Sequence, residues 1–262
     1  MVRAALFVPG DRPDRFAKAA AAGADLIILD LEDAVAPAAK ITARSQVRAW
    51  LAGGGSGMVR INARGTTWHA DDVALVEEFG CPVMIPKTES AGDVFGTAYP
   101  LIETATGLLH TREICAAPGV VRPAFGSVDL AAQLGVDPAD RMALWHARSA
   151  LVLAAASAGV GSPLDGVTTD LTSSETLRED AAHAASLGFG GKLCIHPKQV
   201  GPVRDAFTPS AENLAWAEEV MAAATGGVAV VRGQMIDKPV VDRARRLLRS
   251  GGNPDGARLR NG

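Results

Sequence analysis

Cysteine is scarce in this sequence of 262 residues, and its placement argues against two kinds of small stabilising site. The three cysteines, Cys81, Cys115 and Cys194, lie far apart in the sequence and form no Cys-x-x-Cys pair. We therefore expect neither a disulfide framework nor a cysteine-based zinc site. We expect three reduced, mostly buried thiols, as in a protein of a reducing compartment.

Long apolar runs and an excess of one charge are also lacking. The N-terminal apolar run has about six residues, too short for a signal peptide, and the uncharged stretch 149–164 is too short to span a bilayer. The net charge of −3 offers no overall basic field for nucleic acid or an anionic membrane. We therefore expect a cytoplasmic protein with neither kind of partner.

What the sequence does contain is a repeated alternation of short apolar runs and helical stretches. Runs at 4–9, 26–31, 58–61, 83–86, 99–102, 120–128, 164–168 and 192–195 are predicted as strands, with helices at 12–22, 40–51, 141–158 and 174–187. The runs are nearly continuous in apolar residues, as in strands buried on both faces. This order predicts an α/β fold, a (β/α)8 barrel, with a doubly wound sheet as the alternative.

The pattern changes after the eighth run. A helix at 211–224, an apolar segment at 226–231 and a basic helix at 240–249 follow. We predict a barrel over residues 1–208 and a C-terminal extension over residues 209–262.

Polar side chains follow most of the apolar runs, at the end where a barrel carries its active site. They are Asp30, Glu32, Asp33, Arg60, Asn62, Lys87, Glu89, Glu103, Ser127, Asp129, Thr169, Asp170 and His196. If the barrel prediction is right, all of them converge on one mouth.

Glu103 and Asp129 form the best candidate metal pair among these residues. Both are carboxylates that directly follow an apolar run, on neighbouring units. One or two carboxylates, completed by water and substrate, describe a Mg²⁺ site. The alternative is that one or both cap the following helix or pair with a lysine.

Arg60 and the acidic group before it have two interpretations as well. Arg60 lies inside an apolar run and could clamp a substrate carboxylate or stabilise an oxyanion. A structural ion pair with Asp30 or Glu32 is equally compatible with the sequence. Crowded carboxylates at Asp30, Glu32 and Asp33 could orient water on a metal or exchange protons, or could form a solvated acidic loop.

Three further candidates lie outside this set or at its edge. Arg12, Arg15 and Lys18 could hold phosphates or could form a solvated helix face. His196 is more typical of a hydrogen-bonded structural residue than of a base. Asp237, in the extension, could enter a site when a lid closes, or could be an ordinary loop aspartate.

Taken together, these motifs resemble the citrate lyase beta subunit family, within the wider group of malyl-CoA lyases and HpcH/HpaI-type aldolases. The matching blocks run in order from about residue 3 to 249. They are LFVPGDR at 6–12, LDLEDAV at 29–35, VRIN at 59–62, PKTES at 86–90, ETATG at 103–107, FGSVDLA at 125–131, KLCIHP at 192–197 and GQMID at 233–237.

The resemblance implies a (β/α)8 barrel, usually trimeric, that binds Mg²⁺ and acyl-CoA thioesters. It assigns the metal to Glu103 and Asp129 and the substrate clamp to Arg60. It also implies a lid whose aspartate, matched by Asp237, completes the site of a neighbouring subunit. It also implies, less directly, that Arg12, Arg15 and Lys18 contact the CoA phosphates.

The implied activity is a carbon–carbon lyase that cleaves or forms a hydroxy-carboxyacyl-CoA, such as citryl-, malyl- or citramalyl-CoA, with a small 2-oxo acid as the other product. Glu32 and Asp33 would position water on the metal. Two alternatives stay open: an aldolase for free 2-oxo or hydroxy acids without CoA, and a non-catalytic acyl-CoA-binding subunit. The chain is short for the family, with compact loops such as 95–99.

Overall fold

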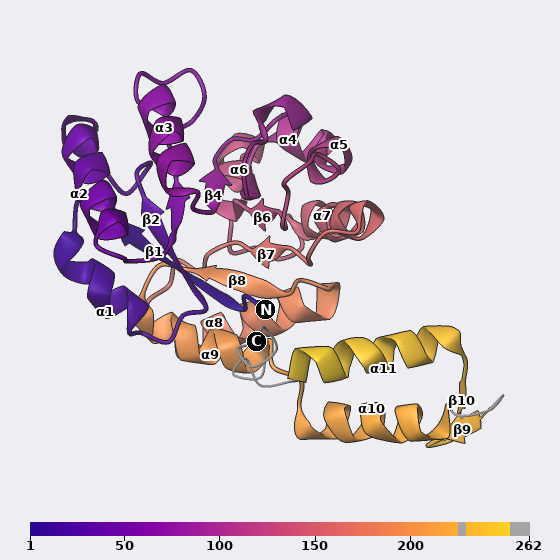
Figure 1. The fold of residues 1–262 in the computed structure, drawn as a ribbon. Helices are drawn as coiled ribbons and strands as arrows, with labels where there is room; N and C mark the ends of the chain where they lie inside the picture. Colours follow the sequence, from indigo (N-terminus) through magenta and orange to yellow (C-terminus); the bar gives the residue numbers. More distant parts are fainter. Residues whose placement is uncertain (225–228, 252–262) are drawn as a thin grey trace. The chain divides into compact units, whose positions relative to one another are not determined.

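The computed structural model describes residues 1–224 and 229–251, which form two compact units. One unit spans Val2–Phe207, and the other begins at Thr208. Figure 1 shows the chain coloured from its N-terminus to its C-terminus. None of the helices in the described ranges has the length and apolar character that crossing a bilayer requires.

The first unit is a closed barrel of eight parallel strands in sequence order. The strands are β1 (Ala4–Pro9), β2 (Leu26–Asp30), β3 (Met58–Arg60), β4 (Val83–Ile85), β5 (Ala98–Ile102), β6 (Ala124–Phe125), β7 (Leu164–Asp165) and β8 (Gly191–Cys194). Pairing of β1 with β8, where Leu6 is opposite Cys194, closes the ring. The predicted (β/α)8 architecture is therefore confirmed.

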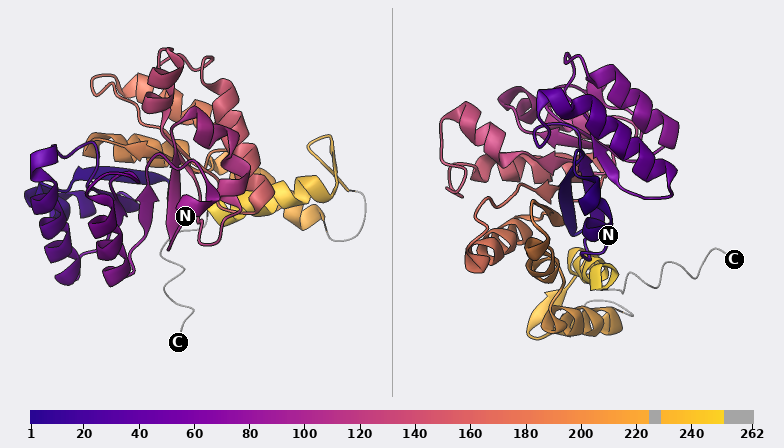
Figure 2. Two further views of the ribbon diagram at one scale, coloured as in Figure 1. Left: turned by 90° about the horizontal axis from the view of Figure 1, so that it is seen from above. Right: turned by 90° about the vertical axis from the view of Figure 1, so that its left-hand side faces the viewer.

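Helices cover the outside of this barrel (Figures 1 and 2). They are α1 (Phe16–Ala20), α2 (Lys40–Ala52), α3 (His69–Phe79), α4 (Ala105–Leu109), α5 (Thr111–Cys115), α6 (Ser127–Leu134), α7 (Trp145–Ala158), α8 (Ser174–Leu187) and α9 (Val200–Ala206). Short 3-10 turns stand at η1 (Pro13–Arg15), η2 (Pro37–Ala39), η3 (Ala91–Asp93) and η4 (Pro197–Gln199). The α8 helix shows why local sequence sets such bounds: the Ser173 side chain caps its first turn, and Gly188 ends it in a left-handed conformation.

The barrel interior and the layer between strands and helices are separate apolar cores. The interior is filled by inward-facing side chains, among them Ile28, Met58, Met84, Leu101 and Leu193. Packing the interior solidly leaves only the carboxyl ends of the strands for a site, as is general for this fold.

The sixth and seventh strands are shorter than the apolar runs predicted. Only Ala124–Phe125 of the run 120–128 is strand, and the chain is already helical from Ser127. Pro123 has no backbone N–H to donate to a neighbouring strand, which shortens the ladder on one side. The prediction that Asp129 directly follows a strand was therefore wrong: it lies in the first turn of α6.

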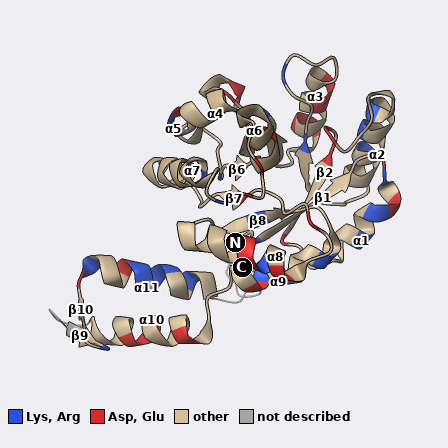
Figure 3. Ribbon diagram, turned by 180° about the vertical axis from the view of Figure 1, so that it is seen from behind, with Lys and Arg blue, Asp and Glu red and all other residues tan. Residues whose placement is uncertain are grey.

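The second unit is a helical hairpin with a small two-stranded sheet. The α10 helix (Ala211–Ala223) and the α11 helix (Lys238–Gly251) pack together, and β9 (Ala229–Val231) pairs antiparallel with β10 (Gln234–Ile236). Ala217, Val220, Ile236 and Ala244 form its core. Part of the predicted apolar segment, residues 226–228, and the tail from 252 lie outside the described residues. Within this unit, the ribbon in Figure 3 is coloured for Lys and Arg mostly on α11 and for Asp and Glu mostly on α10.

Candidate functional site

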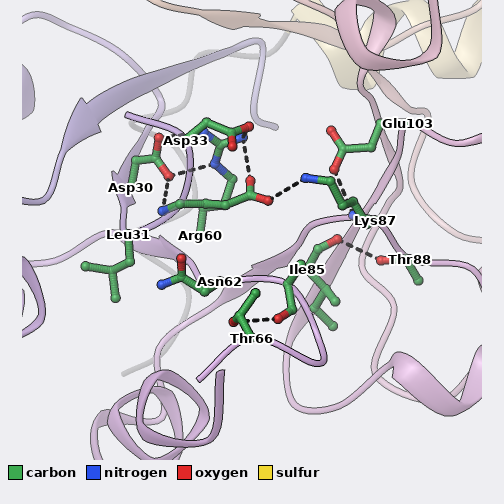
Figure 4. Close-up of polar contacts among 12 residues, drawn as sticks. Asp30, Leu31, Asp33, Arg60, Asn62, Thr66, Ile85, Lys87, Thr88 and Glu103 are labelled. Atoms are coloured by element: carbon green, nitrogen blue, oxygen red, sulfur yellow. Dashed lines mark hydrogen bonds and ion pairs between the residues drawn. The ribbon is translucent and has the colours of Figure 1, made fainter. Parts of the chain in front are cut away.

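The carboxyl ends of consecutive strands place four charged groups of the barrel close together. Asp30 ends β2, Arg60 ends β3, Lys87 comes two residues after β4, and Glu103 directly follows β5. Figure 4 shows that Lys87 lies between Glu103 and the acidic residues around Arg60. This convergence is what the strand order predicted.

Glu103 is a deeply buried carboxylate in this group, with only 2% of its surface exposed. Its Oε1 accepts a hydrogen bond of 2.8 Å from the Lys87 backbone N–H. Burial, the negative charge of Glu32 and a hydrogen-bonding contact with Asp129 raise the pKa of Glu103 to about 8. Asp129 is therefore close to Glu103, although it is itself exposed on α6.

The chemistry of Glu103 and Asp129 fits a hard divalent cation. Over residues 1–224 and 229–251, neither carboxylate forms an ion pair, so their charge is not offset by a lysine or arginine in direct contact. The described residues contain no cluster of three or more metal-ligating side chains, which leaves an oxygen-only site of two carboxylates. Mg²⁺ accepts that set because it keeps several water ligands.

The alternatives considered for this pair are not realised in the part of the chain that the structure describes. Helix α6 has no side-chain capping hydrogen bond at its N-terminus. Thr104, not Glu103, caps α4, by accepting from the Gly107 backbone N–H. Asp129 does stand in the first turn of α6, where a carboxylate is favoured by the helix dipole.

Gly126 allows Glu103 and α6 to approach one another closely. A Cβ atom at Gly126 would lie 2.2 Å from the Glu103 Cβ and 2.6 Å from its Oε2. Any side chain at Gly126 would therefore displace Glu103. The Phe-Gly-Ser-Val-Asp segment thus has a packing reason for its glycine.

Arg60 is buried and fully engaged by acidic side chains. Its Nε and Nη2 donate to the Asp30 carboxylate at 2.7 and 2.5 Å, and its Nη1 lies 3.1 Å from Glu32 and 3.8 Å from Asp33. Its guanidinium also stacks 4.7 Å from the centre of the Phe7 ring. Burial alone would lower the pKa of Arg60, but Asp30 and the other carboxylates hold it above its ordinary value. The structural ion pair is therefore present, and Arg60 also faces the cavity described below.

The acidic loop after β2 is held by contacts that the sequence did not reveal. Asp30 accepts hydrogen bonds from the backbone N–H groups of Glu32 and Ala34. The buried ammonium of Lys40 donates to the carbonyls of Leu31 and Glu32, both at 2.8 Å. Glu32 is 5% exposed, and burial raises its pKa above the ordinary value despite the nearby Arg60. The loop is therefore ordered by buried contacts at Asp30 and Glu32, whereas the Asp33 side chain is 59% exposed.

A cavity of about 290 Å³ joins several of the predicted residues at the mouth of the barrel. Arg60, Asp33, Glu103 and Asp129 supply its charged lining. Its remaining wall is largely apolar, with Phe7, Leu101, Phe125, Val128, Val167, Leu193 and Ile195. A concave site of this kind, apolar with a few converging charges, suits a small organic acid.

A second cavity, of about 540 Å³, contains the predicted phosphate contacts Arg12, Arg15 and Lys18. Phe7 and Ile195 line both cavities, which therefore adjoin. In the structure, Arg12 pairs with Asp14 at 3.0 Å, and both side chains are exposed. This exposed pair costs little to open when an anion binds.

Other residues singled out in the sequence have structural contacts. His196 accepts a hydrogen bond at Nδ1 from the Lys198 backbone N–H, as the structural interpretation predicted. Asn62 donates to the buried Asp72, and Asp170 accepts from Thr172 in an exposed turn. Ser127 and Thr169 line the smaller cavity.

Asp237 lies between β10 and α11 in the second unit. Its Oδ1 accepts a hydrogen bond of 3.2 Å from the Val240 backbone N–H, so it caps α11. The side chain is exposed. This capping contact fixes the start of the helix and leaves the second carboxylate oxygen accessible.

The barrel, its paired carboxylates and its sequence define a class of protein. The pattern of the HpcH/HpaI aldolase/citrate lyase family matches residues 3–98 and 99–197, and the chain belongs to that family. It is 45% identical over 260 residues, with 94% of each chain covered, to a citrate lyase subunit beta-like protein of Mycobacterium tuberculosis. It is 35% identical over 304 residues, covering 94% of this chain and 93% of the relative, to an L-malyl-CoA/beta-methylmalyl-CoA lyase of Cereibacter sphaeroides.

A solved structure also resembles this one closely. Protein CitE of Mycobacterium tuberculosis, in complex with magnesium, acetoacetate and coenzyme A, superposes with a TM-score of 0.84 at 41% identity. The match covers 96% of this chain and 98% of the other. The predicted class, a carbon–carbon lyase that uses Mg²⁺, is therefore confirmed.

Proposed function

We propose that this protein cleaves, or forms, a hydroxy-carboxyacyl-CoA such as citryl-, malyl- or citramalyl-CoA. The products of cleavage are a 2-oxo acid and a shorter acyl-CoA. The observation that carries this proposal is the cavity in which Glu103, Asp129 and Arg60 meet, beside the cavity that contains Arg12, Arg15 and Lys18. One cavity has the size and charge for the reacting acid, and the other has cations for the CoA phosphates.

Glu103 and Asp129 would hold Mg²⁺, which when bound supplies Lewis-acid polarisation of the substrate oxygens. In cleavage, a base takes the hydroxyl proton, the carbon–carbon bond breaks, and its electron pair moves into the thioester enolate. Arg60, buried and preorganised by Asp30 and Glu32, stabilises the developing negative charge. Glu32 and Asp33 would orient water near such an ion.

Asp237 is the proposed proton donor to the enolate carbon in cleavage, and the base that removes that proton in condensation. Since it belongs to the second unit, we propose that this unit is a lid that completes the site of a neighbouring subunit in a homotrimer. The exposed carboxylate of Asp237 and its fixed place at the start of α11 support this role.

Arg12, Arg15 and Lys18 are the proposed contacts of the CoA phosphates. Their cavity shares Phe7 and Ile195 with the metal cavity, so a pantetheine arm could reach from one to the other. An aldolase acting on free acids would have no use for this second cavity. We propose that the enzyme acts in the cytoplasm.

The test is an assay of the purified chain with a panel of acyl-CoA thioesters and free hydroxy acids, with Mg²⁺ or EDTA. We expect turnover of at least one thioester, loss of turnover in EDTA, and no turnover of the free acids. Turnover of free hydroxy acids alone would establish the aldolase. Binding of a thioester without turnover of any compound in the panel would establish a non-catalytic acyl-CoA-binding subunit.

A further inference from the structure

Lys87 has a backbone conformation that side-chain-bearing residues rarely adopt. Its φ is 48°, in the left-handed region, and Arg232 is the one other non-glycine residue in the described ranges with a positive φ. The turn is built firmly around it, because the Thr88 hydroxyl donates to the Ile85 carbonyl at 2.7 Å. A glycine would adopt this φ more easily, so the Lys87 side chain calls for an explanation.

The explanation lies in two contacts that the left-handed conformation makes possible (Figure 4). The Lys87 backbone N–H donates to Glu103 Oε1 at 2.8 Å. Its ammonium donates to Glu32 Oε1 at 2.9 Å. One residue therefore connects a proposed metal ligand on β5 with the acidic loop after β2.

The ammonium of Lys87 is not an ordinary surface charge. Its side chain is 45% exposed, but the Glu32 side chain that it contacts is only 6% exposed. The other oxygen of Glu32, Oε2, is buried without a hydrogen bond, although Arg60 Nη1 lies 3.1 Å away. Lys87 thus provides the one hydrogen bond that orients the Glu32 carboxylate among the described residues.

Lys87 also stands outside the cavity where the reaction is proposed to occur. That cavity is lined by Arg60, Glu103 and Asp129 but not by Lys87. Lys87 lines instead a separate cavity of about 320 Å³, together with Pro86, Glu89 and Thr104. Its link to the reacting groups is through its contacts with Glu32 and Glu103.

We propose that Lys87 is a positioning residue that sets the orientation of Glu32 relative to the metal ligand Glu103. This inference rests on the proposed function, since it assumes that Glu32 acts beside a metal held by Glu103. In this proposal, the left-handed turn after β4 holds in place two carboxylates, Glu32 and Glu103, that follow different strands.

Because Lys87 is positively charged, removing its charge should affect Mg²⁺ affinity differently if Lys87 positions Glu32 than if it only supports the fold. The ammonium and Mg²⁺ are both cations near Glu32 and Glu103, so they repel each other. Removing the ammonium should release Glu32 from its orientation, yet it should not weaken the metal site. A loss of structure around the turn would instead weaken metal binding and turnover together.

The experiment compares Lys87→Met with the wild-type protein in kcat, in Mg²⁺ affinity by titration calorimetry, and in melting temperature. Methionine keeps an unbranched apolar chain as far as the Cε position, without the ammonium, and it keeps the backbone N–H, so the contact with Glu103 is retained. We expect kcat to fall by about tenfold or more, because a charge-assisted hydrogen bond that orients an acting group is lost. We expect the Mg²⁺ dissociation constant to stay the same or to decrease.

Two variants serve as controls. Lys87→Arg keeps a cation within reach of Glu32 and should recover most of the lost kcat. Arg112→Met removes one exposed positive charge from α5, and this side chain has no hydrogen bond or ion pair with another described residue, so its kcat should match the wild type.

The proposal is overturned if Lys87→Met keeps kcat within about twofold of wild type. It is also overturned if Mg²⁺ affinity and melting temperature fall together with kcat, since Lys87 would then only support the fold. Absence of Mg²⁺ binding or of lyase activity in the wild-type protein is a different result, because it would refute the proposed function itself.

Discussion

At the scale of single residues, the Arg60–Asp30 pair combines stability with the proposed chemistry. Asp30 is 1% exposed and receives two hydrogen bonds from the guanidinium. We expect Arg60→Met to destabilise the protein by about 3–5 kcal/mol, because it leaves a buried carboxylate without its partner. Urea unfolding of the variant and the wild type would measure this difference.

A double variant separates the charge effect from packing. Asp30→Asn combined with Arg60→Met removes the unpaired charge, so its stability should lie above that of Arg60→Met alone. If the double variant were less stable than Arg60→Met, the unpaired buried charge of Asp30 would not be the cause of the stability lost in Arg60→Met. Neither variant should retain turnover, because both lack the guanidinium.

Glu103 leads to a second prediction at this scale, because its location costs the metal-free protein stability. Its folded pKa of about 8 is raised above its ordinary value, so its contribution to stability is lost as the pH rises towards that pKa. In EDTA, Glu103→Gln should therefore melt at a higher temperature than wild type, and the difference should grow between about pH 5 and 8.

Adding Mg²⁺ should reverse this order. The wild type should gain melting temperature, because the ion binds only the folded protein, and the variant should gain little. As a control, Asp25→Asn changes a carboxylate that precedes β2, where it accepts from the Arg3 and Ala4 backbone N–H groups and pairs with Arg204, so this variant should gain melting temperature with Mg²⁺ as the wild type does. An equal Mg²⁺ shift in Glu103→Gln and wild type would contradict the assignment of the metal.

The residue scale also shows what could be read from the sequence. Glu103 and Arg60 are predicted from local signals, since Glu103 directly follows an apolar run and Arg60 is a charged residue inside one. Lys87 and Lys40 carry the contacts that order the site, and neither was singled out for that role. Their function depends on which carboxylates and carbonyls are near them in space, which no local pattern in one sequence encodes.

At the scale of elements, prediction followed the strength of the local signals. The α8 helix was predicted with its observed bounds, because a serine cap and a following glycine mark both ends. The sixth strand was predicted too long, because Val120, Val121 and Val128 continue the apolar pattern outside the sheet. Val120 forms only an isolated bridge with Ala98, and Val121 and Val128 are exposed, so the apolar pattern there marks neither a strand nor a buried segment.

The contact between β5 and α6 provides a prediction at this scale. Gly126→Ala introduces a Cβ atom where Glu103 lies, so the start of α6 and Glu103 must move apart. We expect Mg²⁺ affinity to fall by about tenfold or more while the barrel stays folded, measured by calorimetry and circular dichroism. The loss follows from geometry, because no charged group is removed.

The matched control is another glycine with free space around it. A Cβ atom at Gly201, in α9, meets no atom within 4 Å, and this residue lines neither cavity. Gly201→Ala should leave Mg²⁺ affinity unchanged and should not lower stability, since alanine favours helix. If Gly126→Ala bound Mg²⁺ as tightly as Gly201→Ala does, the close approach would not matter for the metal.

At the scale of the whole molecule, the two units divide the proposed chemistry between them. The barrel holds the carboxylate pair, Arg60 and both cavities, whereas Asp237 belongs to the unit that begins at Thr208. The predicted boundary after residue 208 rests on the strand–helix alternation, which stops after the eighth apolar run. If Asp237 enters an active site as proposed, mixed oligomers can show whether that site belongs to its own subunit or to a neighbour.

Mixing two inactive variants answers that question. Glu103→Gln lacks the proposed metal ligand but keeps Asp237. Asp237→Asn lacks the proposed proton donor but keeps the α11 cap, since asparagine also caps helices. If the lid serves a neighbour, co-assembled trimers contain sites with an intact barrel from one chain and an intact lid from the other. Random assembly gives up to about a quarter of the wild-type sites, so a similar share of the activity should return.

Each variant alone, measured at the same concentration, sets the background. A lid that closes on its own barrel yields no intact site in any mixture. Activity no higher than the background would therefore refute exchange between subunits, provided that co-purification through an affinity tag on one variant shows the oligomers to be mixed.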